Sequence, residues 1–231
     1  MRFVCLDTET TGLRVTEGHA IIDIGLVEIL GGERTGRQFQ SYLKCDRKLE
    51  QIVINITQIT DEMLVGKPDF SEIAPQIMDF FTKDSNGADS KAVLVAHNAK
   101  FDMSFLNFYL DRCLGITLAE YQVIDTMDII RHKFPGSKLT LDGICKRYDI
   151  DLSKRVEQGH GALLDAKLLA DVFLKLTADI SIDDFLSNDN KEIIIHKRGE
   201  ILPARQIYQV SDEEIIAHKA ILQKISSNEW L

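Results

Sequence analysis

An apolar segment at the start of the chain leads directly into two acidic residues. Residues 3–6 are apolar, Asp7 and Glu9 follow at positions i and i+2, and a Thr-Thr-Gly turn comes next. On a β-strand, residues i and i+2 point to the same side, so both carboxylates are expected on one face at the end of a buried strand. Two like charges resist burial unless a cation lies between them, and hard divalent cations prefer oxygen ligands. The opening therefore predicts a carboxylate site for Mg²⁺ or Mn²⁺.

The composition restricts the class of protein. The chain has 231 residues, enough for one sizeable domain with an appendage. No apolar stretch is long enough to cross a bilayer, and Asp7 interrupts the first apolar segment before a signal peptide could form. The four cysteines form no Cys-x-x-Cys pair, which argues against a zinc site or a disulfide framework and favours a reducing, cytoplasmic location. The net charge of −9 disfavours a broad basic nucleic-acid surface but not an enzyme that binds a few phosphates through metal ions.

The hydrophobic pattern predicts strands first, and then strands that alternate with helices. Strands are expected at residues 3–6, 20–30, 38–43, 92–96 and 122–124. Helices are expected at residues 60–66, 70–81, 140–148 and 161–177, with another that ends near residue 113, while residues 154–159 are expected to form a loop. This order predicts an α/β fold, in which helices pack on a mixed sheet.

The character of the chain changes after Ala178. Residues 179–192 are acidic and polar with few core-forming side chains, so we expect a linker. Ser211 and Glu214 form a capping box, which begins an amphipathic helix whose apolar stripe needs a surface to cover. We therefore expect a main domain over residues 1–178 and a binding segment over residues 193–231.

Further polar residues lie where predicted strands end and helices begin. Asp102 and Asp165 lie in the first turns of two helices, His160 stands between two glycines, and His97 and Asn98 end a strand. Such positions tend to converge on one edge of a sheet. Taken singly, a helix-start Asp is more often a cap and a histidine between glycines is more often a solvated loop residue, so the coincidence of the whole set carries the metal-site hypothesis. Other aspartates are interpreted as structural or surface acids, with Asp125 the first to reconsider: Asp23, Asp111, Asp125, Asp128, Asp142, Asp149 and Asp171.

Three segments of the chain resemble the motifs of the DnaQ-like 3′–5′ exonuclease superfamily, in its branch with four acids and a histidine (DEDDh). They are residues 7–12, 97–102 and 160–166. The similarity covers nearly the whole chain, and the tail from Ser211 resembles that of the proofreading subunits of bacterial DNA polymerase III. The resemblance implies an RNase H-like mixed five-stranded sheet flanked by helices, plus a C-terminal tail with one amphipathic helix.

The resemblance also implies the roles of the site residues. Two divalent cations, Mg²⁺ or Mn²⁺, would be held by four acids: Asp7, Glu9, Asp102 and Asp165. His160 would be the general base, because an unperturbed histidine has a pKa of about 6.5. Contacts with the terminal nucleotide are implied for six further residues: Thr10, Thr11, Gly12, His97, Asn98 and Phe101. Lys154 and Arg155 would either touch the nucleic-acid backbone or lie in a solvated loop.

The implied function is removal of mispaired nucleotides from a single-stranded or frayed DNA 3′ end. The C-terminal segment would bind a polymerase alpha subunit. Two departures from the family pattern matter: Thr57, Gln58 and Ile59 replace a His-Gly-Ile turn, and residues 180–186 lack the Gln of a sliding-clamp motif, so tight clamp binding is not expected. The alternatives are a stand-alone exonuclease that trims RNA or DNA 3′ ends, a non-catalytic scaffold of the same fold and, more distantly, an Asp-x-Asp phosphatase.

Overall fold

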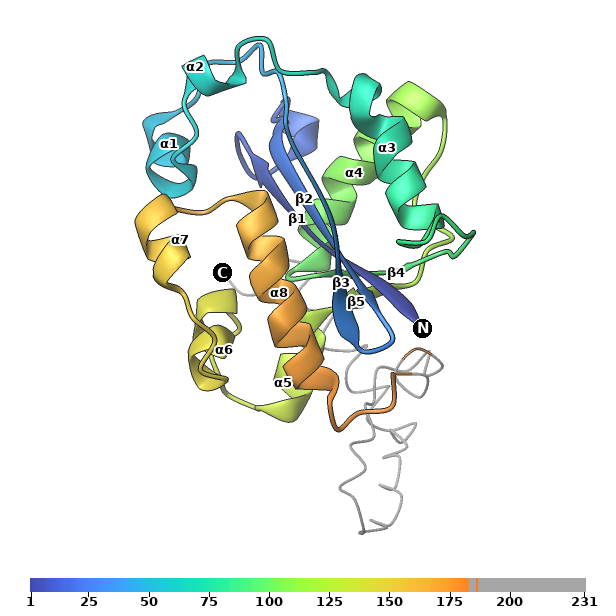
Figure 1. Cartoon of the computed structure of the whole chain (residues 1–231). Coiled ribbons are helices and arrows are strands. Elements are labelled where there is room, and N and C mark those ends of the chain that lie inside the picture. The colour runs from blue at the N-terminus through green and yellow to red at the C-terminus, as the bar shows by residue number, and fades with distance from the viewer. Residues whose placement is uncertain (183–185, 187–231) are drawn as a thin grey trace, which may run out of the picture. The chain divides into compact units, whose positions relative to one another are not determined.

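A five-stranded mixed sheet lies at the centre of the part of the chain that the computed structural model describes, residues 1–182 and 186 (Figure 1). The strands lie in the order β3-β2-β1-β4-β5. Their bounds are β1 (Arg2–Thr10), β2 (Ile21–Leu30), β3 (Glu33–Tyr42), β4 (Val93–Ala96) and β5 (Val123–Asp125). β1, β2 and β3 pair antiparallel, whereas β1, β4 and β5 pair parallel. The predicted α/β fold with a mixed five-stranded sheet is confirmed.

Helices cover both faces of this sheet. The helical elements are η1 (Val15–Glu17), α1 (Gln51–Thr57), α2 (Asp61–Leu64), α3 (Phe70–Thr82), α4 (Ala99–Leu114), α5 (Thr126–Lys133), α6 (Leu141–Arg147), α7 (Ser153–Gln158) and α8 (Ala162–Thr177). Val4 and Leu6 of β1 pack with α3 and α4, while Phe3 and Cys5 pack with α5, α6 and α8 on the other face. Because side chains alternate along a strand, the same register directs residues 7 and 9 toward the α8 face.

Two strands are longer than the sequence pattern predicts. β1 continues past the apolar residues 3–6 to Thr10, so both acids lie within the strand and not after it. The reason is pairing with β2, which places Asp7 opposite Gly25 and Glu9 opposite Asp23 before a bulge interrupts the register. β3 begins at Glu33 because two glycines with positive φ make a tight turn from β2, which extends the hairpin into polar sequence.

Three α-helices were not predicted, α1, α5 and α7, and neither was the short 3-10 helix η1. The prediction of a loop over residues 154–159 is wrong for residues 154–158, which belong to the short helix α7. Just before this helix, the carboxylate of Asp151 accepts hydrogen bonds from the amide and hydroxyl of Ser153, its first residue. The sequence does not predict α1 because its apolar residues do not all lie on one buried face. Ile52 and Ile56 are exposed, whereas Val53 is buried. In α5, the side chain of Asp125 caps the amide of Met127.

The predicted tail lies outside the described residues. The linker expected over residues 179–192 is described only at its start and at residue 186, and the segment over residues 193–231 is not described at all. The division into domain, linker and binding segment therefore stays a prediction. Within the described part, none of the helices combines the length and apolar character that a membrane span requires.

Candidate active site

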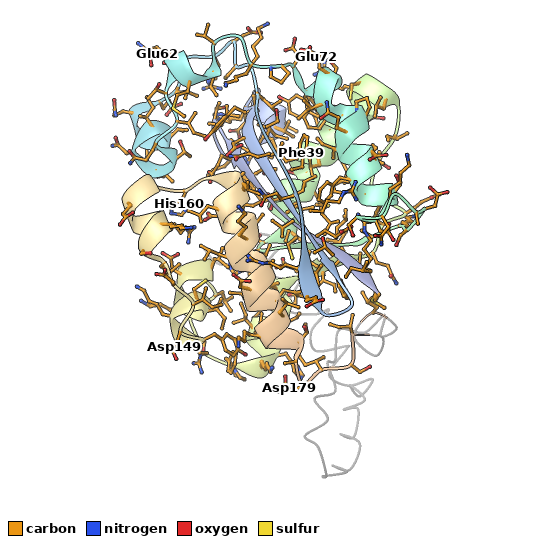
Figure 2. All side chains as sticks on the ribbon, in the orientation of Figure 1. Phe39, Glu62, Glu72, Asp149, His160 and Asp179 are labelled. Atoms are coloured by element: carbon orange, nitrogen blue, oxygen red, sulfur yellow. The ribbon has the colours of Figure 1, made fainter. Side chains whose placement is uncertain are left out.

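All five residues with predicted chemical roles line one cavity of about 410 Å³. Two of them come from β1, one from α4, one from the connection before α8 and one from α8 itself: Asp7, Glu9, Asp102, His160 and Asp165. Figure 2 labels His160 on the connection between α7 and α8. The structure thus gathers side chains that lie up to 158 positions apart in the chain, although their roles stay predictions at this point.

Local structure explains why these side chains meet. Asp7 and Glu9 lie two residues apart on β1 and therefore share a face. Asp102 and Asp165 are each the fourth residue of their helix, α4 and α8, where the N-terminal end of the helix dipole favours negative charge. The hydroxyl of Thr8, on the opposite face of β1 from the two acids, donates a 2.7 Å hydrogen bond to Asp102 Oδ1 and so ties α4 to the strand.

The donor atoms fit a divalent cation. One ligand atom each from Glu9, Asp165 and His160 lies within 4.8 Å of the other two. Asp165 is buried, and its Oδ1 atom has no hydrogen-bond partner within the described part of the chain. A buried carboxylate oxygen without a partner is costly, and an oxygen-rich donor set is the one that Mg²⁺ and Mn²⁺ prefer.

The acids perturb one another electrostatically. Burial raises the pKa of Asp7 well above its usual value, and the charges of Asp102, Glu9 and Asp165 raise it further. Burial, followed by the charge of Asp165, raises the pKa of Glu9 to about 7. Burial also raises the pKa of Asp102 to about 7, although the hydrogen bond from Thr8 acts in the opposite direction. The cluster therefore resists full ionisation unless positive charge is supplied.

Arg155 of α7 supplies one such charge. Its Nη2 atom lies 2.7 Å from Asp165 Oδ2 and 2.7 Å from His160 Nδ1, and its Nη1 atom pairs with Asp142 of α6. Because a guanidinium only donates, His160 Nδ1 is the acceptor of this bond, and the same nitrogen lies 3.3 Å from Asp165 Oδ2. From the sequence, Arg155 is expected either to touch the nucleic-acid backbone or to lie in a solvated loop. In the structure its side chain is only 10 % exposed and lines the same cavity as the acids.

A second cavity, of about 510 Å³, adjoins the first and shares Thr8, Glu9 and Phe101 with it. The predicted nucleotide contacts Thr10, Thr11 and Gly12 line this second cavity. Their hydroxyls are partly engaged: Thr10 Oγ1 donates to the Gly12 carbonyl at 2.7 Å, and Thr11 Oγ1 accepts from the Ala20 amide at 3.0 Å. These bonds fix the shape of the turn. Three exposed apolar side chains complete much of the lining: Leu13, Ile52 and Ile56.

The two remaining predicted contacts differ in position. His97 lines the first cavity, its Nδ1 atom lies 2.9 Å from Thr126 Oγ1, and burial lowers its pKa. Asn98 is exposed, has a left-handed backbone with φ of 68°, and lines neither of the two cavities described above. Its backbone amide donates a hydrogen bond to Asp125 Oδ1 at 3.0 Å, so Asn98 helps to fix the connection between β4 and α4.

The turn that replaces the His-Gly-Ile sequence supports the His160 segment. Gln58 takes a left-handed conformation with φ of 60°, and the amide of His160 donates to the Ile56 carbonyl at 3.0 Å. Gly159 packs so closely against this turn that a Cβ there would lie 2.4 Å from Gln58 Cγ. Since Gly159 also has a φ of 74°, glycine is required at this position both sterically and conformationally.

The fold and the sequence family together define a nuclease. The sequence family described as Exonuclease (RNase_T) matches residues 4–173. A solved structure of exonuclease X in complex with 5′ overhanging duplex DNA has the same fold, with a TM-score of 0.57 and 23 % sequence identity over 77 % of this chain and 90 % of that chain.

Curated relatives extend the similarity to nearly the whole chain. The DNA polymerase III subunit epsilon of Escherichia coli is 38 % identical over 97 % of this chain and 93 % of its own length. The DNA polymerase III subunit epsilon of Pasteurella multocida is 43 % identical over 76 % of this chain and 68 % of its own. The chain therefore belongs to the exonuclease family and, within it, to the DNA polymerase III epsilon subunits.

Proposed function

We propose that the chain is a proofreading 3′–5′ exonuclease subunit of a replicative DNA polymerase. It would remove mispaired 3′-terminal nucleotides by metal-dependent hydrolysis of the last phosphodiester. The observation that carries the proposal is the set of four carboxylates and one histidine around a single cavity. Similarity to epsilon subunits along 97 % of the chain supports DNA as the substrate and a polymerase as the partner.

The acidic residues would hold two divalent cations, Mg²⁺ or Mn²⁺. Asp7 would contact both ions, Glu9 and Asp165 would hold one, and Asp102 would support the other. When bound, such ions supply a water that ionises near neutral pH and neutralise charge on the phosphodiester oxygens. The buried, unpartnered Oδ1 of Asp165 and the raised pKa values of Glu9 and Asp102 support this assignment.

His160 would take the proton of the attacking water. The water oxygen forms the new bond to phosphorus, the bond from phosphorus to the 3′ oxygen of the preceding nucleotide breaks, and a nucleoside monophosphate leaves. In the arrangement seen here, Arg155 donates to Nδ1 of His160, so that bond must break before this nitrogen can accept a proton. Gly159 and Gly161 flank the histidine and give its backbone the freedom to adjust.

The terminal nucleotide would lie in the second cavity. Phe101 borders both cavities and offers a ring for stacking, while Leu13, Ile52 and Ile56 offer apolar surface. Stacking on an aromatic ring tolerates every base, because each base has a π-face. Selection of mismatches would then come from fraying of the DNA end and not from readout of the base.

The polymerase alpha subunit would bind through residues 193–231, and the protein would act with it in the cytoplasm. The amphipathic pattern that begins at Ser211 supports a partner helix, since such a stripe needs a surface to cover. This segment lies outside the described residues, so its support comes from sequence alone.

Digestion of paired and mispaired 3′ ends tests the proposal. The full chain is incubated with labelled DNA in Mg²⁺ or in EDTA, with and without a purified alpha subunit. We expect mononucleotide release in Mg²⁺ only, faster from mispaired ends, and a rate on primer–template that rises with the alpha subunit. Equal rates on both ends with no effect of the alpha subunit would support a stand-alone trimming exonuclease, and absence of release would support a scaffold.

A further inference from the structure

The helices that carry Asp102 and Asp165 begin in the same unusual way. Neither α4 nor α8 has a side-chain hydrogen bond from its own N-cap residue within the described residues. An aspartate from a strand takes that place in both. Asp125 Oδ2 accepts from the amide of Ala99 at 3.0 Å, and Asp23 Oδ2 accepts from the amide of Ala162 at 3.0 Å. Both alanines are the first residues of their helices, three positions before the acid in the site.

Asp125 holds more than one amide. Its Oδ1 atom accepts from the amides of Asn98 at 3.0 Å and Met127 at 2.9 Å, so one carboxylate joins the start of α4 to the start of α5. Asn98 has a φ of 68°, a left-handed conformation that few residues other than glycine, asparagine and aspartate adopt. The two bonds from Asp125 to Asn98 and Ala99 fix this corner of the backbone, and hence the direction in which α4 leaves the sheet.

Asp23 of β2 binds the first amide of α8 and so fixes this helix against the strand. It is fully buried, and Gln40 Nε2 donates to both of its oxygens, at 3.0 and 3.2 Å. Two residues further along β2, Gly25 allows such close approach that a Cβ there would lie 2.3 Å from the carbonyl carbon of Ala162. Asp23 is also the residue paired with Glu9 between β2 and β1. One carboxylate therefore links the strand beside Glu9 to the helix that carries Asp165.

An N-cap serine or asparagine would satisfy an amide at the second or third residue of the helix, and would add no negative charge to an acidic site. It would not, however, join the helix to the sheet, because its hydrogen bond lies within the helix terminus. A carboxylate from a neighbouring strand does both. The choice of strand aspartates at both helices is thus explained by positioning, and not by capping alone.

We propose that Asp23 and Asp125 are positioning residues that set the place of Asp165 and Asp102 relative to the acids of β1. The inference rests on the proposed metal-dependent function. Neither residue lines the two cavities described above, so each acts through the helix that it anchors. Loss of either aspartate loosens one proposed ligand of the metal site. It leaves the second cavity, proposed to hold the terminal nucleotide, intact.

Four variants of the full chain test this inference: D23A, D23N, D125N and the control D69A. Asp69 belongs to a capping box at the start of α3, a helix that contributes no residue to either cavity. In D23N, the amide oxygen still accepts from Ala162 while Gln40 reverses its amide. In D125N, one of the two accepting oxygens becomes a donor, which leaves at least one of three backbone amides unpaired.

The readouts are Mn²⁺ affinity, measured by titration, and steady-state hydrolysis of a single-stranded oligonucleotide. We expect D23A and D125N to bind Mn²⁺ roughly 10- to 100-fold more weakly and to lose kcat with KM unchanged. D69A should lose thermal stability to a similar degree but keep wild-type Mn²⁺ affinity, and D23N should recover most of what D23A loses.

Mn²⁺ affinities of D23A and D125N within twofold of the D69A value would overturn the inference, as would failure of D23N to restore binding. If D23A does not fold, D125N and D23N decide by the same criteria. If the wild-type chain hydrolyses DNA, and D23A and D125N have the same Mn²⁺ affinity as D69A, only the positioning role is refuted. A wild-type chain that neither binds Mn²⁺ nor hydrolyses DNA refutes the proposed function itself.

Discussion

Arg155 and Asp165 share a charge-assisted hydrogen bond of 2.7 Å at the oxygen-rich centre of the site. The same guanidinium nitrogen lies 2.7 Å from His160 Nδ1. One basic side chain thus compensates the charge of a candidate metal ligand and donates a hydrogen bond to the candidate general base. A divalent cation bound to Asp165 would meet the positive charge of this guanidinium on the same carboxylate, so we expect Arg155 and the proposed cation to oppose each other's binding.

The first prediction is that Arg155→Gln raises Mg²⁺ affinity several-fold and destabilises the metal-free chain. The affinity rises because a competitor is removed from Asp165. The stability falls, by about 1 to 3 kcal/mol, because the buried acids lose a hydrogen-bonded partner. Calorimetric Mg²⁺ titration and urea unfolding in EDTA measure the two effects. The neighbouring exposed Lys154→Gln is the control, and unchanged Mg²⁺ affinity in R155Q would exclude the competition.

The second prediction is that Asp7→Asn abolishes hydrolysis while the fold persists. In the proposed site Asp7 holds both ions, so loss of its carboxylate should lower kcat on the order of a thousandfold or more. Burial and three neighbouring acids raise the pKa of Asp7, so a neutral amide should leave the metal-free chain at least as stable as the wild type. Circular dichroism and a single-stranded digestion assay check both parts. Near wild-type turnover would end the metal-site interpretation.

The third prediction concerns pH. The pKa values of Glu9 and Asp102 rise from ordinary values of 4.5 and 3.8 to about 7, so the folded chain binds these protons more tightly than the unfolded chain. Their contribution to stability is therefore complete below about pH 4 and is lost as the pH rises through about 7.

Glu9→Gln isolates this effect, because the amide does not titrate. In EDTA, the free energy of unfolding of E9Q relative to wild type should increase between pH 4.5 and 7.5, as measured by urea unfolding. Saturating Mg²⁺ should reduce the difference at the upper pH, since the ion binds the ionised carboxylates. A difference that is constant across this pH range would show that Glu9 has an ordinary pKa.

Local sequence patterns predicted which acids line the cavity, but not the residues that position those acids. Asp7 and Glu9 follow from the two-residue period of a strand, and Asp102 and Asp165 follow from their places at helix starts. By contrast, the bond between Asp23 and Ala162 joins positions 139 residues apart, and no local period reveals it. Asp125 ends a strand of three residues, and its bonds to Asn98 and Ala99 likewise join segments that lie far apart in the chain.

Arg155 was missed for a related reason. It lies on α7, a helix of six residues that is too short to show an apolar period. Its partners Asp142 and Asp165 come from two other helices, α6 and α8, so their meeting depends on tertiary packing. An arginine five residues before the histidine of an acidic motif was the available signal, because a buried acidic cluster requires positive charge.

The fourth prediction is that Phe101→Ala weakens binding of single-stranded DNA by about 1 to 3 kcal/mol, the value of one stacked base. Phe101 borders both cavities, and its loss should raise KM more than it lowers kcat. Phe108→Ala is the matched control, since Phe108 lies on the same helix but lines a different hollow beside Tyr109. Equal KM values for the two variants would exclude stacking on Phe101.

The last prediction separates the two chemical roles open to His160. As a general base, its replacement by Gln should lower kcat roughly 10²- to 10⁴-fold, flatten the acidic side of the pH–rate profile at saturating Mn²⁺ and leave Mn²⁺ affinity unchanged. The position of His160 within 4.8 Å of oxygens from Glu9 and Asp165 also permits a role as a metal ligand. If His160 is a ligand, the same replacement should weaken Mn²⁺ binding. Mn²⁺ titration with pH–rate profiles of both proteins distinguishes these roles. Because Arg155 donates to Nδ1 in the structure, R155Q should increase the fraction of His160 that is free to accept a proton, and an increase in kcat that disappears in the double variant would assign the base to His160.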